Sequence, residues 1–264
     1  MVYNDNRKNK YRNDKYIKKS GKTGFITWLV IAIAVIYTTF LQSHPGNVKP
    51  ETVKPETVKS ETVKTETVND IPEYSGETYA VINGNVPFFT ADDMTTEAFE
   101  TYSDFDSLGR CGVAYANACR ELMPRKKRGD ISHIKPTGWV QRKYPGIVDS
   151  DPPYLYNRSH LIAYSLTAEN DNERNLITGT RYMNYDGMRP FEEMVVEYID
   201  ETDNHVLYRV TPMFTGDNLL ADGVLMEALS VEDGGKGICF CVYCYNVQPG
   251  IEIDYSTGEN RKIK

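Results

Sequence analysis

Residues 23–43 carry no charge over 21 consecutive positions, and residues 28–37 at their centre are all aliphatic or aromatic. As an α-helix, which rises 1.5 Å per residue, this segment is about 31 Å long and can cross the hydrocarbon layer of a membrane. We therefore predict a transmembrane segment at residues 23–43, with the folded domain after it.

The residues before this segment are strongly basic. Residues 1–23 contain eight Lys and Arg against two Asp and Glu, whereas the forty residues after Ser43 contain four Lys and no Arg. A basic flank of this kind stays in the cytoplasm. We therefore expect residues 1–22 to form a cytoplasmic tail, residues 23–43 to be a signal anchor in the cell membrane, and the remainder of the chain to be extracellular.

A cleaved signal peptide is the alternative interpretation of the same residues. The apolar core is longer than in most signal peptides, and no small-x-small cleavage site follows it directly. These two features favour the anchor, and cleavage would make the protein secreted instead.

A five-residue repeat follows within residues 44–70. Its copies are Val-Lys-Pro-Glu-Thr twice, then Val-Lys-Ser-Glu-Thr and Val-Lys-Thr-Glu-Thr. A period of five fits neither a helix nor a solenoid, and one apolar residue in five cannot bury a core. We predict a disordered linker here, outside the folded domain.

Residues 71–264 contain alternating segments that indicate a folded domain. Patterns of apolar residues and turns predict helices at residues 95–102 and 191–199, the second with an apolar stripe of Phe191, Met194, Val195, Tyr198 and Ile199. Strands are predicted at residues 79–83, 157–166, 205–210, 223–231 and 237–247. This order favours an α+β domain with one central antiparallel sheet and helices packed against it.

The five cysteines do not form a recognisable metal or redox motif. Cys241 and Cys244 lie in a predicted strand, where side chains three positions apart point to opposite faces, so we expect buried thiols. Cys111 and Cys119 lie outside this strand. Outside the cell they could form a disulfide, and the sequence does not decide between a disulfide and two free thiols.

The most informative residues are Asn157-Arg158-Ser159-His160, followed by Asn175, Asn184 and Glu192. Hydrolysis of a phosphodiester needs a base for the attacking water and positive charge for the phosphate oxygens and the leaving oxygen. A His with a pKa near neutrality can be the base, a divalent cation can supply charge, and an Arg can clamp phosphate oxygens. Mg²⁺ retains most of its waters, so a single Asn oxygen can hold it.

These residues resemble the signature of the DNA/RNA non-specific endonuclease family, the ββα-metal or His-Me finger nucleases. The resemblance is specifically to the branch that contains DNA-entry and streptococcal secreted nucleases. The family signature is Asp-Arg-Gly-His, the Asn175-to-Asn184 spacing also fits, and residues 208–218 and 245–250 resemble later family segments. The resemblance covers residues ~72–258 and implies a ββα-metal finger embedded in the domain.

The resemblance also implies individual roles. His160 would be the general base, and Asn184 the protein ligand of one Mg²⁺ ion, with Mn²⁺ as an expected substitute. Asn175 and Glu192 would support the water shell of the metal. Arg158 and Arg181 would lie near the phosphate of a DNA or RNA substrate.

Two positions depart from the family signature, because Asn157 replaces Asp and Ser159 replaces Gly. They are the basis of a rival interpretation, in which the domain is a catalytically degenerate surface module that binds nucleic acid without cutting it. The base and the metal ligand are retained, which favours the enzyme.

The charge of the domain argues against a nucleic-acid partner unless it is unevenly distributed. Residues 71–264 contain 18 Lys and Arg against 30 Asp and Glu, but residues 120–143 have a local excess of six positive charges. We expect this basic run to contact phosphates through Arg125, Lys126, Lys127, Arg128, Arg142 and Lys143. No base-reading motif is visible, which favours contact without sequence preference.

The predicted topology can be tested on intact cells. Protease added outside should remove the domain at residues 71–264, because the basic flank holds the N-terminus inside, and an immunoblot of the cells measures the loss. A domain that is protected in intact cells but degraded after lysis would contradict this orientation. A product in the medium that starts near residue 44 would show cleavage and secretion.

Overall fold

The computed structural model describes residues 71–264. The predicted tail, anchor and repeat linker lie outside these residues and stay predictions. Among the residues that are described, no helix has both the length and the apolar character needed to cross a membrane.

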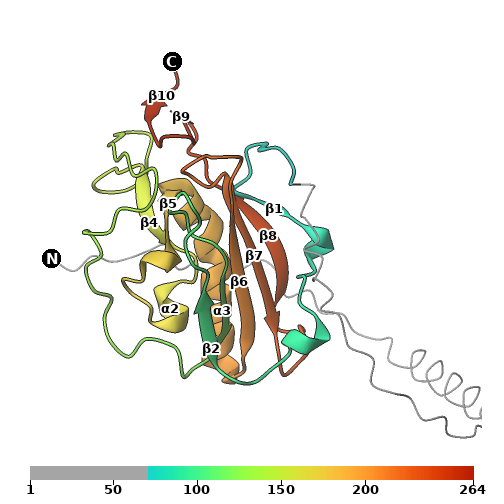
Figure 1. The fold of residues 1–264 in the computed structure, drawn as a ribbon. Helices are drawn as coiled ribbons and strands as arrows, with labels where there is room; N and C mark the ends of the chain where they lie inside the picture. Colours follow the sequence, from blue (N-terminus) through green and yellow to red (C-terminus); the bar gives the residue numbers. More distant parts are fainter. Residues whose placement is uncertain (1–70) are drawn as a thin grey trace, which may run out of the picture. The chain divides into compact units, whose positions relative to one another are not determined.

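A six-stranded sheet forms the centre of the domain (Figure 1). Its strands lie in the order β1-β8-β7-β6-β3-β2, and every neighbouring pair is antiparallel. In chain order these strands are β1 (Tyr79–Val81), β2 (Phe99–Tyr102), β3 (Ala114–Ala118), β6 (Val206–Met213), β7 (Gly223–Ser230) and β8 (Cys239–Tyr245). The α+β class and the central antiparallel sheet are thus as predicted.

Two small sheets and several short helices complete the domain. The strands β4 (Tyr156–His160) and β5 (Leu176–Thr180) form one antiparallel pair, and β9 (Ile251–Ile253) and β10 (Asn260–Lys262) form the other. The helical segments are η2 (Asn83–Asn85), η3 (Ala91–Asp93), α2 (Tyr164–Thr167), η4 (Glu173–Asn175), η5 (Met183–Met188) and α3 (Arg189–Thr202).

The long helix α3 packs against one face of the central sheet (Figure 1). Phe191, Val195 and Ile199 are buried, and the Phe191 ring lies 5.0 Å from that of Phe240 on β8. The predicted apolar stripe is confirmed at these three positions and half-buried Tyr198, whereas Met194 is 46% exposed. The fully buried residues Phe191, Val195 and Ile199 are four positions apart and lie in one row along the helix. Met194 lies beside this row.

The chain order strand, strand, helix is realised in β4, β5 and the continuous helical stretch of η5 and α3. Because β4 and β5 pair only with each other, they form a two-stranded unit separate from the central sheet. This is the ββα arrangement implied by the family resemblance, with His160 at the end of β4 and Asn184 in η5, which follows β5.

Two predicted elements are wrong in part. Residues 95–102 do not form a helix, because Phe99–Tyr102 is strand β2, which pairs along its whole length with β3. The strand predicted at residues 157–166 ends at His160, since its partner β5 begins at Leu176, directly opposite. The chain then turns into the short helix α2.

The cysteines are free thiols throughout the described residues. Cys241 and Cys244 are buried on opposite faces of β8, one packing with Tyr243 and the other with Val242, as predicted from the strand period. Cys111 and Cys119 are buried and unpaired with each other, so the disulfide left open by the sequence is not formed.

Candidate functional site

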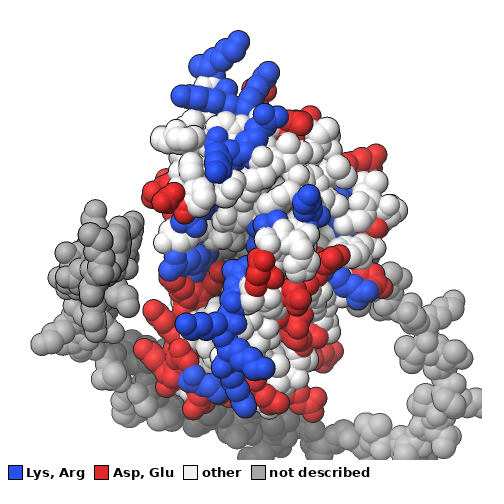
Figure 2. Space-filling view, turned by 90° about the vertical axis from the view of Figure 1, so that its left-hand side faces the viewer, with Lys and Arg blue, Asp and Glu red and all other residues white. Residues whose placement is uncertain are grey.

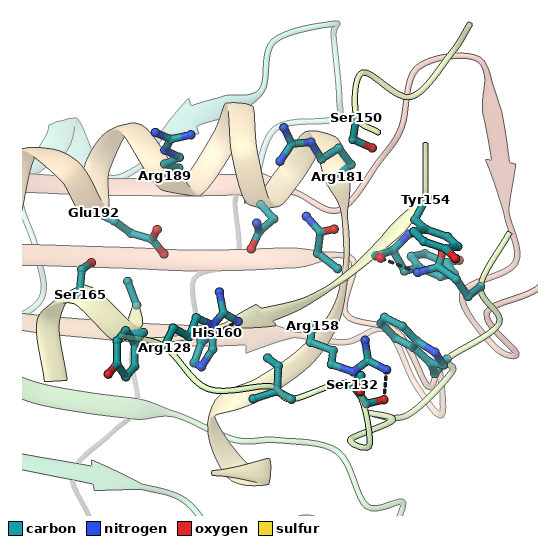
Figure 3. Close-up of a pocket in the computed structure, with 18 of the residues that line it drawn as sticks. Arg128, Ser132, Ser150, Tyr154, Arg158, His160, Ser165, Arg181, Arg189 and Glu192 are labelled. Carbon is teal, nitrogen blue, oxygen red and sulfur yellow. Dashed lines mark hydrogen bonds between the residues drawn. The ribbon is translucent and has the colours of Figure 1, made fainter. Parts of the chain in front are cut away.

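A cavity of about 920 Å³ lies beside the ββα unit and is lined by residues of β4, η5 and α3. Figure 3 shows His160, Arg158, Arg181 and Glu192 among the side chains that line it. Arginines outnumber carboxylates in the walls, with Arg128, Arg158, Arg181 and Arg189 against Glu192 and Glu193. The cavity is therefore a local basic site in an acidic domain.

His160 is held in a single ring orientation at the end of β4. Its Nε2 lies 2.9 Å from the main-chain oxygen of Asn170, and a carbonyl oxygen can only accept, so Nε2 carries the proton. The other nitrogen, Nδ1, is then unprotonated, and its lone pair accepts a hydrogen bond from Nη2 of Arg128 at 3.2 Å. A basic nitrogen is thus presented next to a guanidinium, and both residues line the cavity.

Asn175 fixes the chain that follows His160. Its side-chain oxygen accepts from the Ile162 amide at 2.8 Å, and its side-chain nitrogen donates to the Ile162 carbonyl at 2.9 Å. The Leu161 amide also donates to the Asn175 carbonyl at 2.8 Å. Asn175 is fully buried and does not line the cavity, so this geometry favours a positioning role over the predicted contact with metal-bound water.

The surroundings of His160 disfavour its protonated form. Burial is the main cause, the positive charge of Arg128 is the second, and together they lower the pKa of His160 to about 4. Main-chain hydrogen bonds to Asn170 and Glu169 act in the opposite direction and raise the pKa. The ring is consequently neutral, with Nδ1 available as a base, over the whole physiological pH range.

Asn184 and Glu192 bring two oxygen donors to the cavity from one continuous helical stretch. Asn184 belongs to the π-helical segment η5 and Glu192 to the first turn of α3, and eight positions correspond to about two helical turns. Both side chains line the cavity and are of intermediate exposure, and neither forms a side-chain hydrogen bond within the described residues. Partnerless amide and carboxylate oxygens suit a hard cation such as Mg²⁺.

Any such cation would have few protein ligands. Within residues 71–264 no three His, Cys, Asp or Glu side chains are grouped as a metal site would require. A site built on one amide oxygen leaves most coordination positions to water and to a ligand, which is how Mg²⁺ is commonly bound. Burial, together with the nearby charge of Glu193, raises the pKa of Glu192 to about 8, so the group is mostly a neutral carboxylic acid near pH 7. A bound cation would lower this pKa and favour the carboxylate.

Arg158 is used in a way that the sequence did not predict. Nε donates to the Ile134 carbonyl and Nη2 to the Ser132 carbonyl, each at 2.5 Å, and Cζ lies 4.3 Å from the centre of the Trp139 ring. The guanidinium therefore connects the loop at residues 132–139 to β4 by hydrogen bonds, and its other N–H groups remain available to a ligand in the cavity.

The two departures from the family signature occupy different places. Asn157 lines the cavity, so an uncharged amide stands there instead of a carboxylate. Ser159 is fully buried and is not part of the lining, and a Cβ atom at Gly179 on β5 would lie only 2.2 Å from its hydroxyl oxygen. The Ser159 side chain thus occupies the space that Gly179 provides, away from the cavity.

Arg181 and Arg189 flank a single aromatic ring. Their Cζ atoms lie 3.6 and 4.5 Å from the centre of Tyr185, and Arg189 also pairs with Glu193 at 2.6 Å. Arg181 is therefore in the cavity wall, as expected for a phosphate contact. Arg189 was missed because a lone Arg at the start of a helix carries no distinguishing pattern.

The predicted basic run divides into three parts. Arg128 reaches into the cavity, while Arg125, Lys126 and Lys127 are exposed just before it in the chain. Arg142 instead pairs with Glu259 at 2.7 Å, and Lys143 lies 4.9 Å over the Tyr154 ring. Figure 2 accordingly shows Lys and Arg side chains in separate groups, with acidic side chains between them. Arg142 and Lys143 thus already have protein contacts, and phosphate binding by the run stays a prediction.

Sequence comparisons relate the chain to nucleases. The model of the DNA/RNA non-specific endonuclease family matches residues 90–232. A deoxyribonuclease from Streptococcus dysgalactiae subsp. equisimilis is 36% identical over 110 residues, which are 40% of this chain and 32% of that protein. The match thus spans about a third of the length of that relative.

Solved structures with a similar fold are also nucleases. NucA from Streptococcus agalactiae with bound magnesium superposes with a TM-score of 0.61 at 24% identity, over 69% of this chain and 87% of that chain. Sda1 nuclease with a bound zinc ion gives 0.58 at 26% identity, over 71% and 97%. At 24% identity, the similarity to NucA is a similarity of fold alone.

The state of His160 can be measured by NMR titration of the full-length protein. We expect the ring to remain neutral with the proton on Nε2 until the pH falls to about 4, because burial and Arg128 lower its pKa. Arg128→Ala should raise the pKa towards its ordinary value of about 6.5, since a neighbouring cation disfavours the imidazolium. Half-protonation near pH 6.5 in the unmodified protein would contradict this geometry.

Proposed function

This chain belongs to the DNA/RNA non-specific endonuclease family, and we propose that it is a metal-dependent endonuclease that hydrolyses phosphodiester bonds of DNA and RNA without sequence preference. The observation that carries the proposal is the environment of His160. Its hydrogen bond to Asn170 leaves Nδ1 unprotonated, beside Arg128, in a cavity that also contains Asn184, Glu192 and three further arginines.

In the proposed reaction His160 takes the proton from the attacking water. Nδ1 can accept it because Nε2 already donates to the Asn170 carbonyl, and that bond also stabilises the imidazolium that results. Arg128, 3.2 Å from Nδ1, can donate its N–H groups to the phosphate as negative charge develops on its oxygens. When Arg128 donates to the phosphate instead of to Nδ1, the Nδ1 lone pair is released to take the proton of the attacking water.

Asn184 would hold the divalent ion, with Glu192 close enough to hydrogen-bond its waters. A bound Mg²⁺ or Mn²⁺ ion would supply the positive charge that stabilises the leaving oxygen. The free oxygen atoms of both side chains support this assignment, and the magnesium in NucA and the zinc in Sda1 are consistent with it.

Binding would be through the phosphate backbone, with the cavity arginines and exposed Arg125, Lys126 and Lys127 as contacts. Such contacts position nucleic acid without reading its sequence. The proposed site of action is outside the cell, at the membrane if residues 23–43 remain as an anchor.

The rival function, binding without cleavage, is less well supported by the site. A module that only binds needs the basic surface, but it has no use for a neutral His beside amide and carboxyl oxygens that lack hydrogen-bond partners. Ser159, one of the two departures on which the rival depends, lies outside the cavity lining.

The roles of His160 and Asn184 can be separated by their rescue behaviour. His160→Ala is expected to slow cleavage of plasmid DNA by roughly 10²–10⁴, the usual effect of removing a general base. Added imidazole should restore part of the rate, because it replaces the deleted group. Asn184→Ala should respond to raised Mg²⁺ and not to imidazole, because it weakens metal binding.

Cleavage rates measured over a series of Mg²⁺ and imidazole concentrations provide the comparison, with circular dichroism to verify folding. Chelator should abolish cleavage by the unmodified protein. A folded His160→Ala protein with unchanged turnover would refute the mechanism, and a well-folded unmodified protein that binds but never cuts would favour the rival.

The exposed part of the basic run should contribute affinity without selectivity. Replacing Arg125, Lys126 and Lys127 by Ala is expected to weaken DNA binding equally across sequences. It should also flatten the log–log dependence of affinity on salt by up to about 3 units, because each phosphate contact adds about 0.9. Fluorescence anisotropy with the His160→Ala protein measures binding without cleavage.

Arg120 and Arg261 provide the matched control, since both already pair with carboxylates. Arg120 bonds to Asp200 and Asp203, and Arg261 pairs with Glu252 at 2.8 Å. Their replacement by Ala should leave the salt dependence nearly unchanged. An equal slope for the triple variant and the unmodified protein would mean that the three cations do not contact phosphate.

A further inference from the structure

We propose that Trp139, Tyr154 and Arg158 form a subsite for an unstacked nucleobase next to the phosphate that is cut. We call these three residues the stacking wall. The inference rests on the proposed nuclease function and adds a substrate class to it, namely nucleic acid in which at least one base is free to leave the helical stack.

The first observation is the rigid placement of the Arg158 guanidinium. Its hydrogen bonds to the Ile134 and Ser132 carbonyls fix the orientation of the guanidinium plane, and Cζ lies 4.3 Å from the centre of the Trp139 ring. Trp139 is itself supported by Tyr156, which is 1% exposed and lies 6.3 Å away, ring centre to ring centre. Aromatic rings and guanidinium planes are the surfaces on which proteins stack single bases.

The second observation is the exposed ring of Tyr154. Main-chain bonds from Tyr144 to Pro153 at 2.9 Å and from Leu155 to Arg142 at 3.0 Å hold this segment in place. The residue nevertheless remains 39% exposed and lines the cavity, with the ammonium group of Lys143 4.9 Å from the ring centre. A Tyr side chain has only two side-chain torsions, so on this fixed backbone its ring loses little conformational freedom when a base stacks on it.

The stacking wall lies to one side of the proposed catalytic residues. In Figure 3, Tyr154 and Arg158 are on one side of His160, and Glu192 is on the other. All of these residues line the same cavity. A nucleotide whose phosphate lies at His160 and Arg128 can therefore direct a neighbouring base towards the stacking wall.

This placement explains how the cavity can bind bases without selecting among them. Every base has a π face, so stacking tolerates any sequence, and the cavity arginines contact the phosphates. A base within a duplex has both faces covered by its neighbours and must unstack first. Single strands, loops and frayed ends are consequently the preferred substrates, by roughly tenfold if stacking contributes as it does in other single-strand sites.

The test uses the full-length protein, Mg²⁺ and end-labelled single-stranded DNA of mixed sequence that carries one abasic residue. The unmodified protein should cut at every phosphate except one, at a fixed offset from the abasic residue, where cutting is about tenfold weaker. Tyr154→Ala should remove this gap, because no position then depends on a stacked base. Tyr154→Phe, which retains the ring, should keep the gap.

Tyr74 offers a matched control, because it is also 39% exposed but packs edge-on against Tyr245, outside the cavity lining. Tyr74→Ala should retain the gap. A uniform ladder from the active unmodified protein, or a gap that persists in Tyr154→Ala, would overturn the stacking wall while the nuclease function stands. Absence of cutting on the unmodified strand would instead overturn the nuclease function itself.

Discussion

The hydrogen bond from His160 Nε2 to the Asn170 carbonyl is the interaction on which the site depends. At 2.9 Å it fixes both the tautomer and the orientation of the ring, so that Nδ1 is the unprotonated nitrogen. The bond exists because β4 ends at His160 and Asn175 holds the following turn by its Ile162 contacts. The buried side-chain amide of Asn175, which does not line the cavity, thus helps to place Nδ1 of His160 in it.

Charge is distributed to suit an anionic ligand despite the acidity of the domain. Four arginines and two glutamates line the cavity, so positive charge is in excess there. The acidic residues that make the domain negative overall lie outside it. Several cations outside the cavity are neutralised locally, as in the Arg142–Glu259 and Arg120–Asp203 pairs. Because exposed charges are screened beyond roughly 10 Å, the local excess at the cavity matters more to a phosphate than the net charge of the domain.

The sequence was sufficient for features set by local pattern and fixed spacing. It predicted the antiparallel sheet, the buried line of α3 and the strand that carries His160, but not the helical segment η5 that carries Asn184. It failed at residues 95–102, where pairing with β3 overrides a weak helical pattern, since strand pairing depends on residues distant in the chain. The same limit applies to the cavity: the Arg158 contacts with Ser132 and Ile134, and the exposure of Tyr154, arise only when separate loops meet.

The contact between Arg128 and His160 connects ligand binding to the strength of the base. Without a ligand, the guanidinium lies 3.2 Å from Nδ1, and its charge contributes to the low pKa of His160. A phosphate that accepts hydrogen bonds from Arg128 offsets that charge with its own, which favours the imidazolium and raises the pKa. His160 is therefore a weak base in the free protein and a stronger one when an anionic phosphate is bound beside it. This coupling places the greatest basicity where a substrate is present to be attacked.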